Sequence, residues 1–127
     1  MDYYEATASE FLQSKGLEII GENFTWPGGE IDLIALDQGE LIFIEVKYRS
    51  NSKHGHPLEF ITPHKISKLR KTADYYLLHQ WQGIEPWVRF DVIGLLPLDN
   101  KPLSQNKPIE NTENFKSFTI EWIQAAF

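Results

Sequence analysis

Two periodicities of apolar residues run along the chain and predict a mixture of helices and strands. Helical spacing predicts helices over residues 3–15 and 63–79, as in Ala8, Phe11 and Leu12 of the first. A turn of helix is also expected at the C-terminus. The element order predicts an α/β or α+β sandwich, with a mixed β-sheet flanked by α-helices. Short apolar runs bounded by turn-forming residues predict the strands, over residues 17–24, 30–36, 41–48, 87–96 and 115–122.

Local signals mark where the two helices begin. Asp2 is a suitable cap for the first helix, and Glu5 three residues later is its reciprocal partner in a capping box. Thr62 followed by Pro63 combines a capping side chain with a first-turn proline. Both helix starts are therefore predicted from side-chain chemistry as well as from apolar spacing.

Charged residues interrupt the two apolar strands that flank the segment "DQG". With a two- or four-residue turn centred on Gln38 and Gly39, Asp32 falls opposite Glu45, and Glu30 falls opposite Lys47. Opposed carboxylates repel, and a divalent cation such as Mg²⁺ offsets the repulsion because carboxylate oxygens are its preferred ligands. Lys47 follows Glu45 on the same strand face, where it can orient a water molecule or stabilise charge on a phosphate. This pattern predicts phosphodiester hydrolysis at a metal site.

Two alternatives to this site remain open at the level of sequence. A three-residue loop with a bulge would shift the register by one residue and put Asp32 and Glu45 on different faces. The charges are also typical of a solvated hairpin end, in which Glu30 and Lys47 form an ordinary cross-strand ion pair. The apolar frame "LIFIEVKY" favours a functional role, because charges embedded in such a frame usually have a partner or a task.

Composition and charge narrow the class of protein. The chain has 127 residues and no cysteine, which fits one domain over residues 1–127 and excludes disulfides and thiolate metal sites. We expect a cytoplasmic protein, since no run approaches the roughly 20 apolar residues of a membrane span and no signal-peptide pattern is seen. The net charge of −6 argues against a wholly DNA-binding surface. Residues 47–71, however, contain seven basic residues and one acidic residue, so this region could face a polyanion.

Three segments resemble a known family: "GGEIDLIALDQGELIFIEVKYRS", "KISKLRKTADYYL" and "RFDVIG". They are similar to the successive blocks of the bacterial YraN-type proteins, which are predicted nucleases related to archaeal Holliday junction resolvases. The signature of this restriction-endonuclease-like superfamily is an acid followed at variable distance by acid-x-Lys. The resemblance covers nearly the whole chain. It implies a restriction-endonuclease-like mixed β-sheet flanked by α-helices, and cleavage of DNA phosphodiesters that depends on Mg²⁺ or Mn²⁺.

The resemblance also implies roles for individual residues. Carried over by position, Asp32 and Glu45 would be the metal ligands and Lys47 the catalytic lysine. Glu5 falls where the family has a glutamate on its first helix and would assist catalysis, although it is equally suited to the capping box. Basic side chains that follow the hairpin would contact DNA phosphates; they are Arg49, Lys53, Lys65, Lys68 and Lys71.

Other polar groups have ordinary explanations. Without the resemblance, the lysines of the second helix are typical of a solvated helix face. His54 and His56 have a spacing compatible with a metal, but they lie in a predicted loop without a third ligand. Arg89 and Asp91 share a strand face and predict a salt-bridged pair. Residues 97–114 are polar, contain prolines and predict a long loop.

The sequence as a whole predicts a metal-dependent DNA endonuclease or exonuclease that acts on branched or otherwise structured DNA. Cutting a junction requires active sites on both opposing strands, which favours a homodimer with two-fold symmetry. Two other classes remain open. One is a catalytically inactive nucleic-acid- or protein-binding module with a nuclease fold, which the net charge of −6 favours. The other is a metal-dependent hydrolase of small phosphates.

Overall fold

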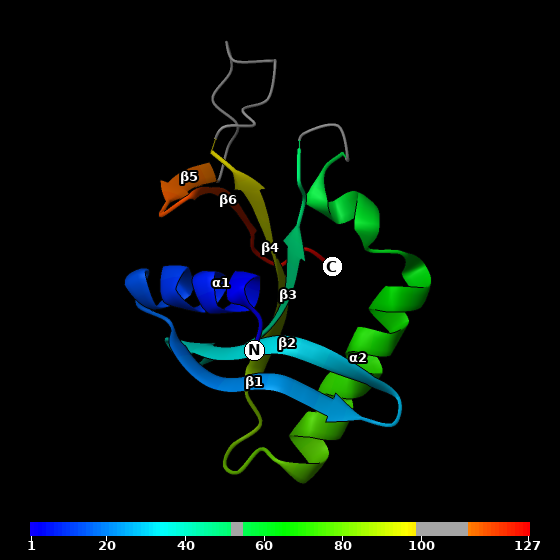
Figure 1. Ribbon diagram of the computed structural model, residues 1–127. Helices are drawn as coiled ribbons and strands as arrows, with labels where there is room; N and C mark the ends of the chain where they lie inside the picture. The colour runs from blue at the N-terminus through cyan, green and yellow to red at the C-terminus, as the bar shows by residue number, and fades with distance from the viewer. Residues whose placement is uncertain (52–54, 99–111) are drawn as a thin grey trace.

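A computed structural model describes residues 1–51, 55–98 and 112–127, which form one six-stranded sheet with helices on both faces (Figure 1). The strand order is β1-β2-β3-β4-β6-β5, and only β3 and β4 of the neighbouring pairs are parallel. The helices are α1 (Tyr3–Ser14), the 3-10 helix η2 (Pro57–Phe60) and α2 (Pro63–His79). The strands are β1 (Glu18–Trp26), β2 (Gly29–Asp37), β3 (Glu40–Tyr48), β4 (Trp87–Pro97), β5 (Thr112–Phe115) and β6 (Phe118–Ile123). The predicted α/β architecture with a mixed sheet is confirmed.

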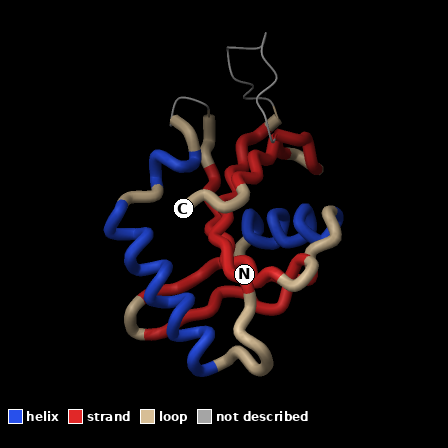
Figure 2. The backbone as a smooth tube through the Cα atoms, turned by 180° about the vertical axis from the view of Figure 1, so that it is seen from behind, coloured by secondary structure: helices blue, strands red, loops and turns tan. Residues whose placement is uncertain are grey.

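The two long helices cover opposite faces of the sheet, as the view from behind makes clear (Figure 2). On one face, Phe11 and Leu12 of α1 pack in a buried cluster with strand residues such as Ile44. On the other face, Leu69 and Ala73 of α2 pack in a second cluster that includes Ile34 and Phe43 of the sheet. The alternation of side chains along β2 and β3 therefore supplies both cores, because successive residues point to opposite faces.

Both predicted helix starts are present. The Asp2 carboxylate accepts a hydrogen bond from the Glu5 N–H at 2.7 Å, and the Thr62 hydroxyl accepts one from the Lys65 N–H at 3.2 Å. Pro63 occupies the first turn of α2. These caps satisfy backbone donors that have no partner within a helix, which fixes where each helix begins.

The β2–β3 hairpin has a two-residue turn, which is one of the two turn lengths that give the predicted register. Gln38 and Gly39 both have positive φ, at 49° and 88°, and Asp37 pairs with Glu40. The register continues as Leu36 opposite Leu41 and onward to Leu33 opposite Ile44. The alternative with a three-residue loop and a bulge is therefore wrong, because it would shift every one of these pairs by one residue.

The C-terminal region differs from its prediction. The single strand expected over residues 115–122 is a hairpin of β5 and β6, because Lys116 adopts a φ of 52° and turns the chain there. The last residues do not form the expected helical turn; instead the Ala126 N–H donates to the carbonyl of Phe90, and the Phe127 ring stacks on the Phe90 ring. Burial of the terminal aromatic ring thus prevails over local helix propensity.

Arg89 and Asp91 form the predicted ion pair, and the pair also anchors the C-terminal segment. Asp91 is fully buried, and its carboxylate accepts hydrogen bonds from Arg89 Nε at 3.0 Å and from Trp122 Nε1 at 2.9 Å. The N–H of Ala125 donates to the same carboxylate at 3.0 Å. A buried carboxylate is tolerated here because three donors surround it.

Two further predictions bear on the loops. Most of the long loop predicted over residues 97–114 lies outside the described residues, as do residues 52–54 of the loop predicted after β3. The short helix η2 in that second region was not anticipated.

No helix within the described residues is long and apolar enough to cross a membrane.

Candidate active site where two strands separate

The paired ladder of β2 and β3 ends at Leu33 and Ile44, next to Asp32 and Glu45. In a continued ladder the Val46 N–H would bond to the backbone of β2, since paired positions hold a constant register. The Asp32 carboxylate takes that place, because its Oδ2 accepts the hydrogen bond from the Val46 N–H at 2.8 Å. Asp32 therefore terminates the pairing and lies beside the strand that carries Glu45.

The environment of Asp32 opposes its ionisation. Asp32 is only 7% exposed, and burial raises its pKa to about 8. The Glu45 carboxylate contributes to the same increase through a side-chain hydrogen bond and charge repulsion, whereas the Val46 N–H and the Lys65 ammonium group act in the opposite direction. Two carboxyl groups held together in this way favour a shared proton or a bound cation.

Lys65, in the first turn of α2, lies beside this carboxylate pair. Its Nζ is 3.7 Å from Glu45 Oε2, with 38% of the Lys65 side chain and 11% of the Glu45 side chain exposed. The distance exceeds that of a good hydrogen bond, which is about 2.7 to 3.2 Å for nitrogen and oxygen. The contact is therefore a loose ion pair that provides partial neutralisation.

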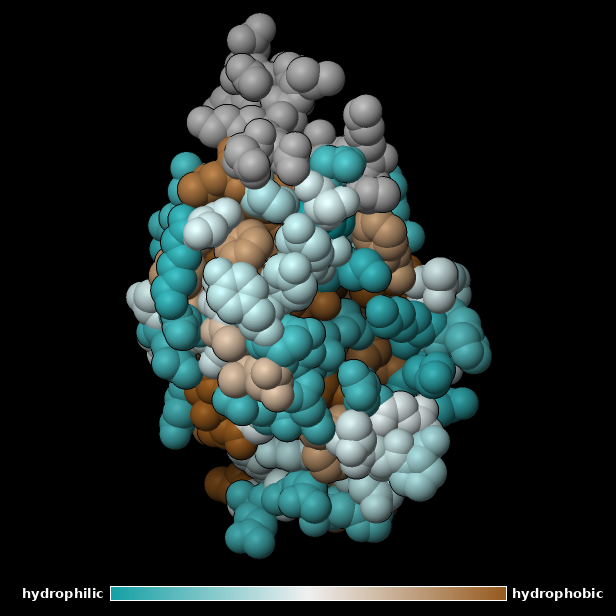
Figure 3. Space-filling view, viewed as in Figure 1, coloured by the Kyte–Doolittle hydropathy of each residue, from teal (hydrophilic) through white to brown (hydrophobic). Residues whose placement is uncertain are grey.

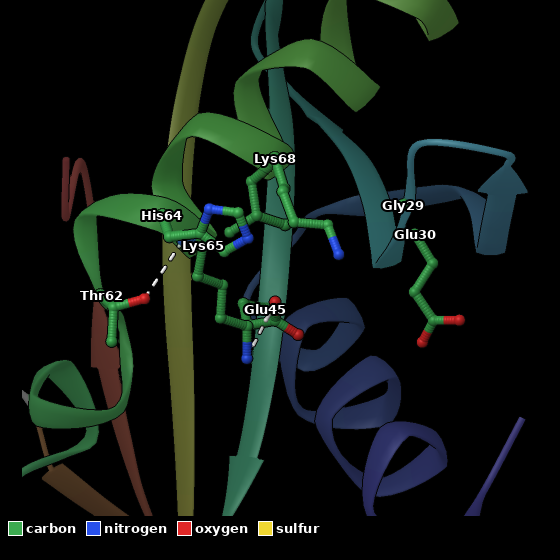
Figure 4. Close-up of a pocket in the computed structure, with 8 residues that line it drawn as sticks. Gly29, Glu30, Glu45, Thr62, His64, Lys65 and Lys68 are labelled. Atoms are coloured by element: carbon green, nitrogen blue, oxygen red, sulfur yellow. Dashed lines mark hydrogen bonds and ion pairs between the residues drawn. The ribbon is translucent and has the colours of Figure 1, made fainter.

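A pocket of about 410 Å³ opens next to the pair. It lies between the start of α2 and the start of β2, and Figure 4 shows Lys65 reaching Glu45 while Lys68 extends toward the side on which Glu30 stands. His64, which no sequence pattern singled out, also lines this pocket. The lining thus combines carboxylates with cationic side chains, as expected of a site for a metal and a phosphate.

Glu5 approaches the site from α1. Its carboxylate accepts a hydrogen bond from Asn23 Nδ2 of β1 at 2.5 Å, while Asp2 caps the helix. Burial raises the pKa of Glu5, and the charge of Asp32 contributes to the increase, although the Asn23 hydrogen bond lowers it. Glu5 is therefore an electrostatic neighbour of Asp32. Asn23 has a φ of 49°, a conformation that asparagine tolerates better than most residues, but no pattern in the sequence marked this position.

Lys47 has a different partner from the one that the solvated-hairpin alternative requires. Its Nζ lies over the ring of Phe60 at 4.7 Å from the centroid. Glu30, its expected cross-strand partner in that alternative, pairs with Thr25 of β1 and lines the pocket. The predicted opposition of Glu30 and Lys47 fails because the β2–β3 ladder stops before it reaches them. Phe60 was missed because it belongs to the unanticipated η2.

The remaining predicted residues are spread around the site. Lys68 lines the pocket, and Lys71 is exposed further along α2. Arg49 is half-buried after the end of β3, where its Nε has no hydrogen-bond partner among the described residues. Burial lowers its pKa, and Glu121 and Glu59 partly oppose that decrease. Lys53 lies outside the described residues.

Of the two histidines whose spacing is compatible with a metal, His56 is described and has partners within the protein. His56 Nε2 lies 2.6 Å from Glu121 Oε2, and its Nδ1 accepts the Leu58 N–H at the start of η2. His54 lies outside the described residues. His56 is therefore occupied in fastening η2 to β6.

The donor set of the carboxylate pair fits a hard divalent cation. Among the residues that the structure describes, no group of three or more His, Asp or Glu side chains is arranged to hold a metal. Mg²⁺ does not require such a cage, since it is commonly held by one or two carboxylates and completes its shell with water and substrate phosphates. Asp32 and Glu45 supply such carboxylates, and the pKa of Asp32 reflects a site in which a cation would relieve repulsion.

The fold and this site define an α/β protein with paired carboxylates at the separation point of two antiparallel strands. The model of the "Uncharacterised protein family UPF0102" matches residues 4–95. The chain therefore belongs to this family, which is that of the YraN-type proteins that its motifs resemble.

Individual relatives support the family assignment. A UPF0102 protein of Vibrio vulnificus (strain YJ016) is 44% identical over 93 residues, which are 72% of this chain and 76% of that protein. One from Chlorobium limicola is 41% identical over 125 residues, or 97% of this chain and 87% of the relative. One from Coxiella burnetii (strain RSA 493) is 45% identical over 91 residues, covering 72% and 76%. The family model's match over residues 4–95 includes the hairpin, α2 and most of β4.

Proposed function

We propose that this protein is a divalent-metal-dependent nuclease that hydrolyses phosphodiester bonds in DNA, with branched DNA as the preferred substrate. The observation that carries the proposal is the position of Asp32 and Glu45, whose carboxyl groups adjoin where β2 and β3 separate, with the Lys65 ammonium group beside them. Carboxylates held close together next to a pocket lined by lysines suit a metal ion and a phosphate better than they suit a solvated hairpin end.

Each residue has a role that follows from its place. Asp32 and Glu45 would hold Mg²⁺ or Mn²⁺, which supplies charge neutralisation at the phosphate and an acidified water. Lys47 follows on the same strand face as Glu45 and stabilises charge on the phosphate or orients the attacking water. Its contact with Phe60 keeps the ammonium group at the end of β3. Glu5, held by Asn23, accepts a proton at the edge of the site.

DNA approaches along the face that carries the basic residues. In Figure 3, hydrophilic side chains surround a hollow between the α1 side and the α2 side of the molecule. Lys65 and Lys68 border the pocket, and Lys71 extends the same helix. They contact backbone phosphates, which carry no sequence information, so that binding responds to DNA shape rather than to sequence. A DNA substrate implies a cytoplasmic location, and a junction substrate implies a two-fold dimer.

The direct test is calorimetric titration of Mn²⁺ or Mg²⁺ into the protein. The wild type is expected to bind the cation, and both Asp32→Asn and Glu45→Gln are expected to lose binding by tenfold or more because each removes a ligand charge. Asp74→Asn, an exposed change on α2, serves as the matched control. Absence of binding at millimolar cation in the presence of DNA would refute the metal site.

The second candidate is an inactive module that retains the nuclease fold and binds DNA or a protein. The net charge of −6 favours it, because most of the surface would repel DNA. Lys47→Ala separates the two functions. In a nuclease this change abolishes cleavage of branched, nicked and single-stranded DNA while DNA binding and cation binding persist. In a module, the wild type cleaves none of these substrates.

A further inference from the structure

Lys65 lies between the carboxylate pair and the adjoining pocket. Its ammonium group is 3.7 Å from Glu45 Oε2, and the same side chain lines the pocket beside the carboxylate pair. With 38% of the side chain exposed and a loose ion pair, Lys65 can exchange this partner for another at little cost. Its position in the first turn of α2 is fixed by the Thr62 cap, so that only the long side chain needs to move.

The charges of the pocket are balanced as the structure stands. Lys65 and Lys68 are opposed by Glu30 and Glu45, and His64 adds a titratable group. Within the described residues Lys68 forms no ion pair, whereas Lys65 is engaged with Glu45. An anionic ligand therefore gains little net attraction from the pocket until Glu45 is neutralised by something else.

We propose that Lys65 moves from Glu45 to a nucleotide phosphate when a divalent cation binds at Asp32 and Glu45, so that the pocket binds a phosphate more tightly in the cation-loaded protein. The inference rests on the proposed metal site and adds a ligand class, a nucleoside monophosphate or one nucleotide of a DNA strand. The cation takes over the neutralisation of Glu45, and the released ammonium group and Lys68 then both face the phosphate.

The dimensions and lining of the pocket fit this ligand class. A volume of about 410 Å³ lies within the range of pockets for small ligands, which is roughly 300 to 1,000 Å³. Leu69 contributes an apolar wall, and Thr62 contributes a hydroxyl group. A phosphate held by Lys65 would lie next to the carboxylate pair, so that a strand bound there has one phosphate beside the proposed metal.

Thermodynamic linkage makes the exchange measurable without any cleavage. If the cation frees Lys65 for the phosphate, each ligand must raise the affinity of the protein for the other by the same factor. Couplings of this kind are commonly about fivefold or more. Lys65 also repels the cation, so that removing its charge should raise cation affinity in the absence of nucleotide by about fivefold or more, since two unit charges about 4 Å apart in water interact by about 1 kcal/mol and the cation carries two.

The experiment titrates Mn²⁺ into the full chain with and without thymidine 5′-monophosphate, after subtraction of cation binding to the nucleotide itself. In the wild type the nucleotide should tighten cation binding at least fivefold, with the reciprocal gain when nucleotide is titrated. Lys65→Met should bind Mn²⁺ more tightly alone and lose the coupling. Arg70→Met, an exposed change on the same helix that does not line the pocket, should behave as the wild type.

Additional arms identify the ligand and separate the two proposals. Thymidine without phosphate should give no coupling, whereas coupling by inorganic phosphate alone would assign the pocket to free phosphate. Lys68→Met should weaken nucleotide binding several-fold but retain the coupling factor. A wild type that binds Mn²⁺ with a coupling factor near one, or a Lys65→Met variant that keeps the factor, overturns this inference alone. A wild type that binds no cation overturns the proposed function as well.

Discussion

At the scale of single residues, Asp32 has both a structural and a chemical role. It ends the β2–β3 ladder by accepting the Val46 N–H, and it places a poorly solvated carboxyl group beside Glu45. Its place beside the last pair of that ladder follows from the sequence, since the turn at Gln38 and Gly39 fixes the register. Its hydrogen bond to the Val46 N–H could not be predicted from the sequence, because the separation of the two strands depends on the elements that pack on either side of them.

Asp32→Asn should stabilise the protein without cation at neutral pH. The folded-state pKa of about 8 lies above the ordinary value of 3.8, so the folded state binds the proton more tightly than the unfolded state. Stability from this group is fully present below about pH 4 and is lost as the pH rises to about 8. The free energy of unfolding is expected to fall by an amount on the order of 2 to 4 kcal/mol, at 1.36 kcal/mol per pKa unit with allowance for relaxation of the site. Asparagine keeps an acceptor for Val46 and carries no charge.

Urea unfolding between pH 4 and pH 9 measures this effect. The free energy of unfolding of the wild type should fall over that range more steeply than that of Asp32→Asn, and the two proteins should converge near pH 4. Asp74→Asn on the exposed side of α2 is the control and should follow the wild type. Parallel curves for Asp32→Asn and the wild type would contradict a raised pKa.

At the scale of elements, the site depends on η2, which the sequence did not reveal. This short helix is fastened to β4 by Pro57, which packs against Gly94, and to β6 by His56 and Glu121. It carries Phe60 to Lys47. Proline and a histidine cap explain η2 once it is seen, but four residues leave too short a pattern for periodicity to detect.

Gly94→Ala should displace η2 and impair the site. An added Cβ would stand 2.4 Å from Pro57 Cγ, and overpacking of this kind typically costs about 1 to 3 kcal/mol. We expect a lower melting temperature, retained Mn²⁺ binding and loss of most DNA cleavage, because Phe60 leaves Lys47. Adding Pro57→Ala to this variant removes the clash and should restore part of the stability. A Gly94→Ala protein with wild-type stability would argue against close packing of η2 on β4.

At the scale of the whole molecule, the net charge of the chain is negative, whereas basic residues gather around the pocket and α2. The chain carries −6 overall, yet Lys47, Lys65, Lys68 and Lys71 belong to the neighbourhood of the pocket and α2. In the proposed nuclease, attraction to DNA would be restricted to this region, and the rest of the surface would limit non-specific binding. The helices α1 and α2 cover opposite faces of the sheet (Figure 1). Glu5 of α1 and Lys65 of α2 therefore approach the Asp32 and Glu45 carboxylates from separate helices.

The affinity for a DNA junction should depend on salt concentration as expected for a protein that contacts about four phosphates. The logarithm of affinity is expected to fall with the logarithm of salt concentration with a slope of about −3 to −4. Lys71→Ala should reduce the magnitude of the slope by about one. Lys116→Ala, at the β5–β6 turn where the lysine contacts Glu10, should leave the slope unchanged. Fluorescence anisotropy in Ca²⁺, at several salt concentrations, tests this; a flat salt dependence would contradict phosphate binding.

The sequence by itself determined the two long helices and the β2–β3 hairpin with its register, which brings Asp32 and Glu45 to the end of the paired ladder. These depend on local signals: caps at Asp2 and Thr62, a turn at Gly39 and alternation along strands. Only the tertiary structure decided that β2 and β3 separate at Asp32, that Asn23 holds Glu5, that η2 brings Phe60 to Lys47, and that Lys65 reaches Glu45. Each of these contacts joins residues far apart in the chain or depends on competition between backbone and side-chain partners. Such contacts are decided by the packing of whole elements, because no local pattern of residues specifies which distant group will fill a given place.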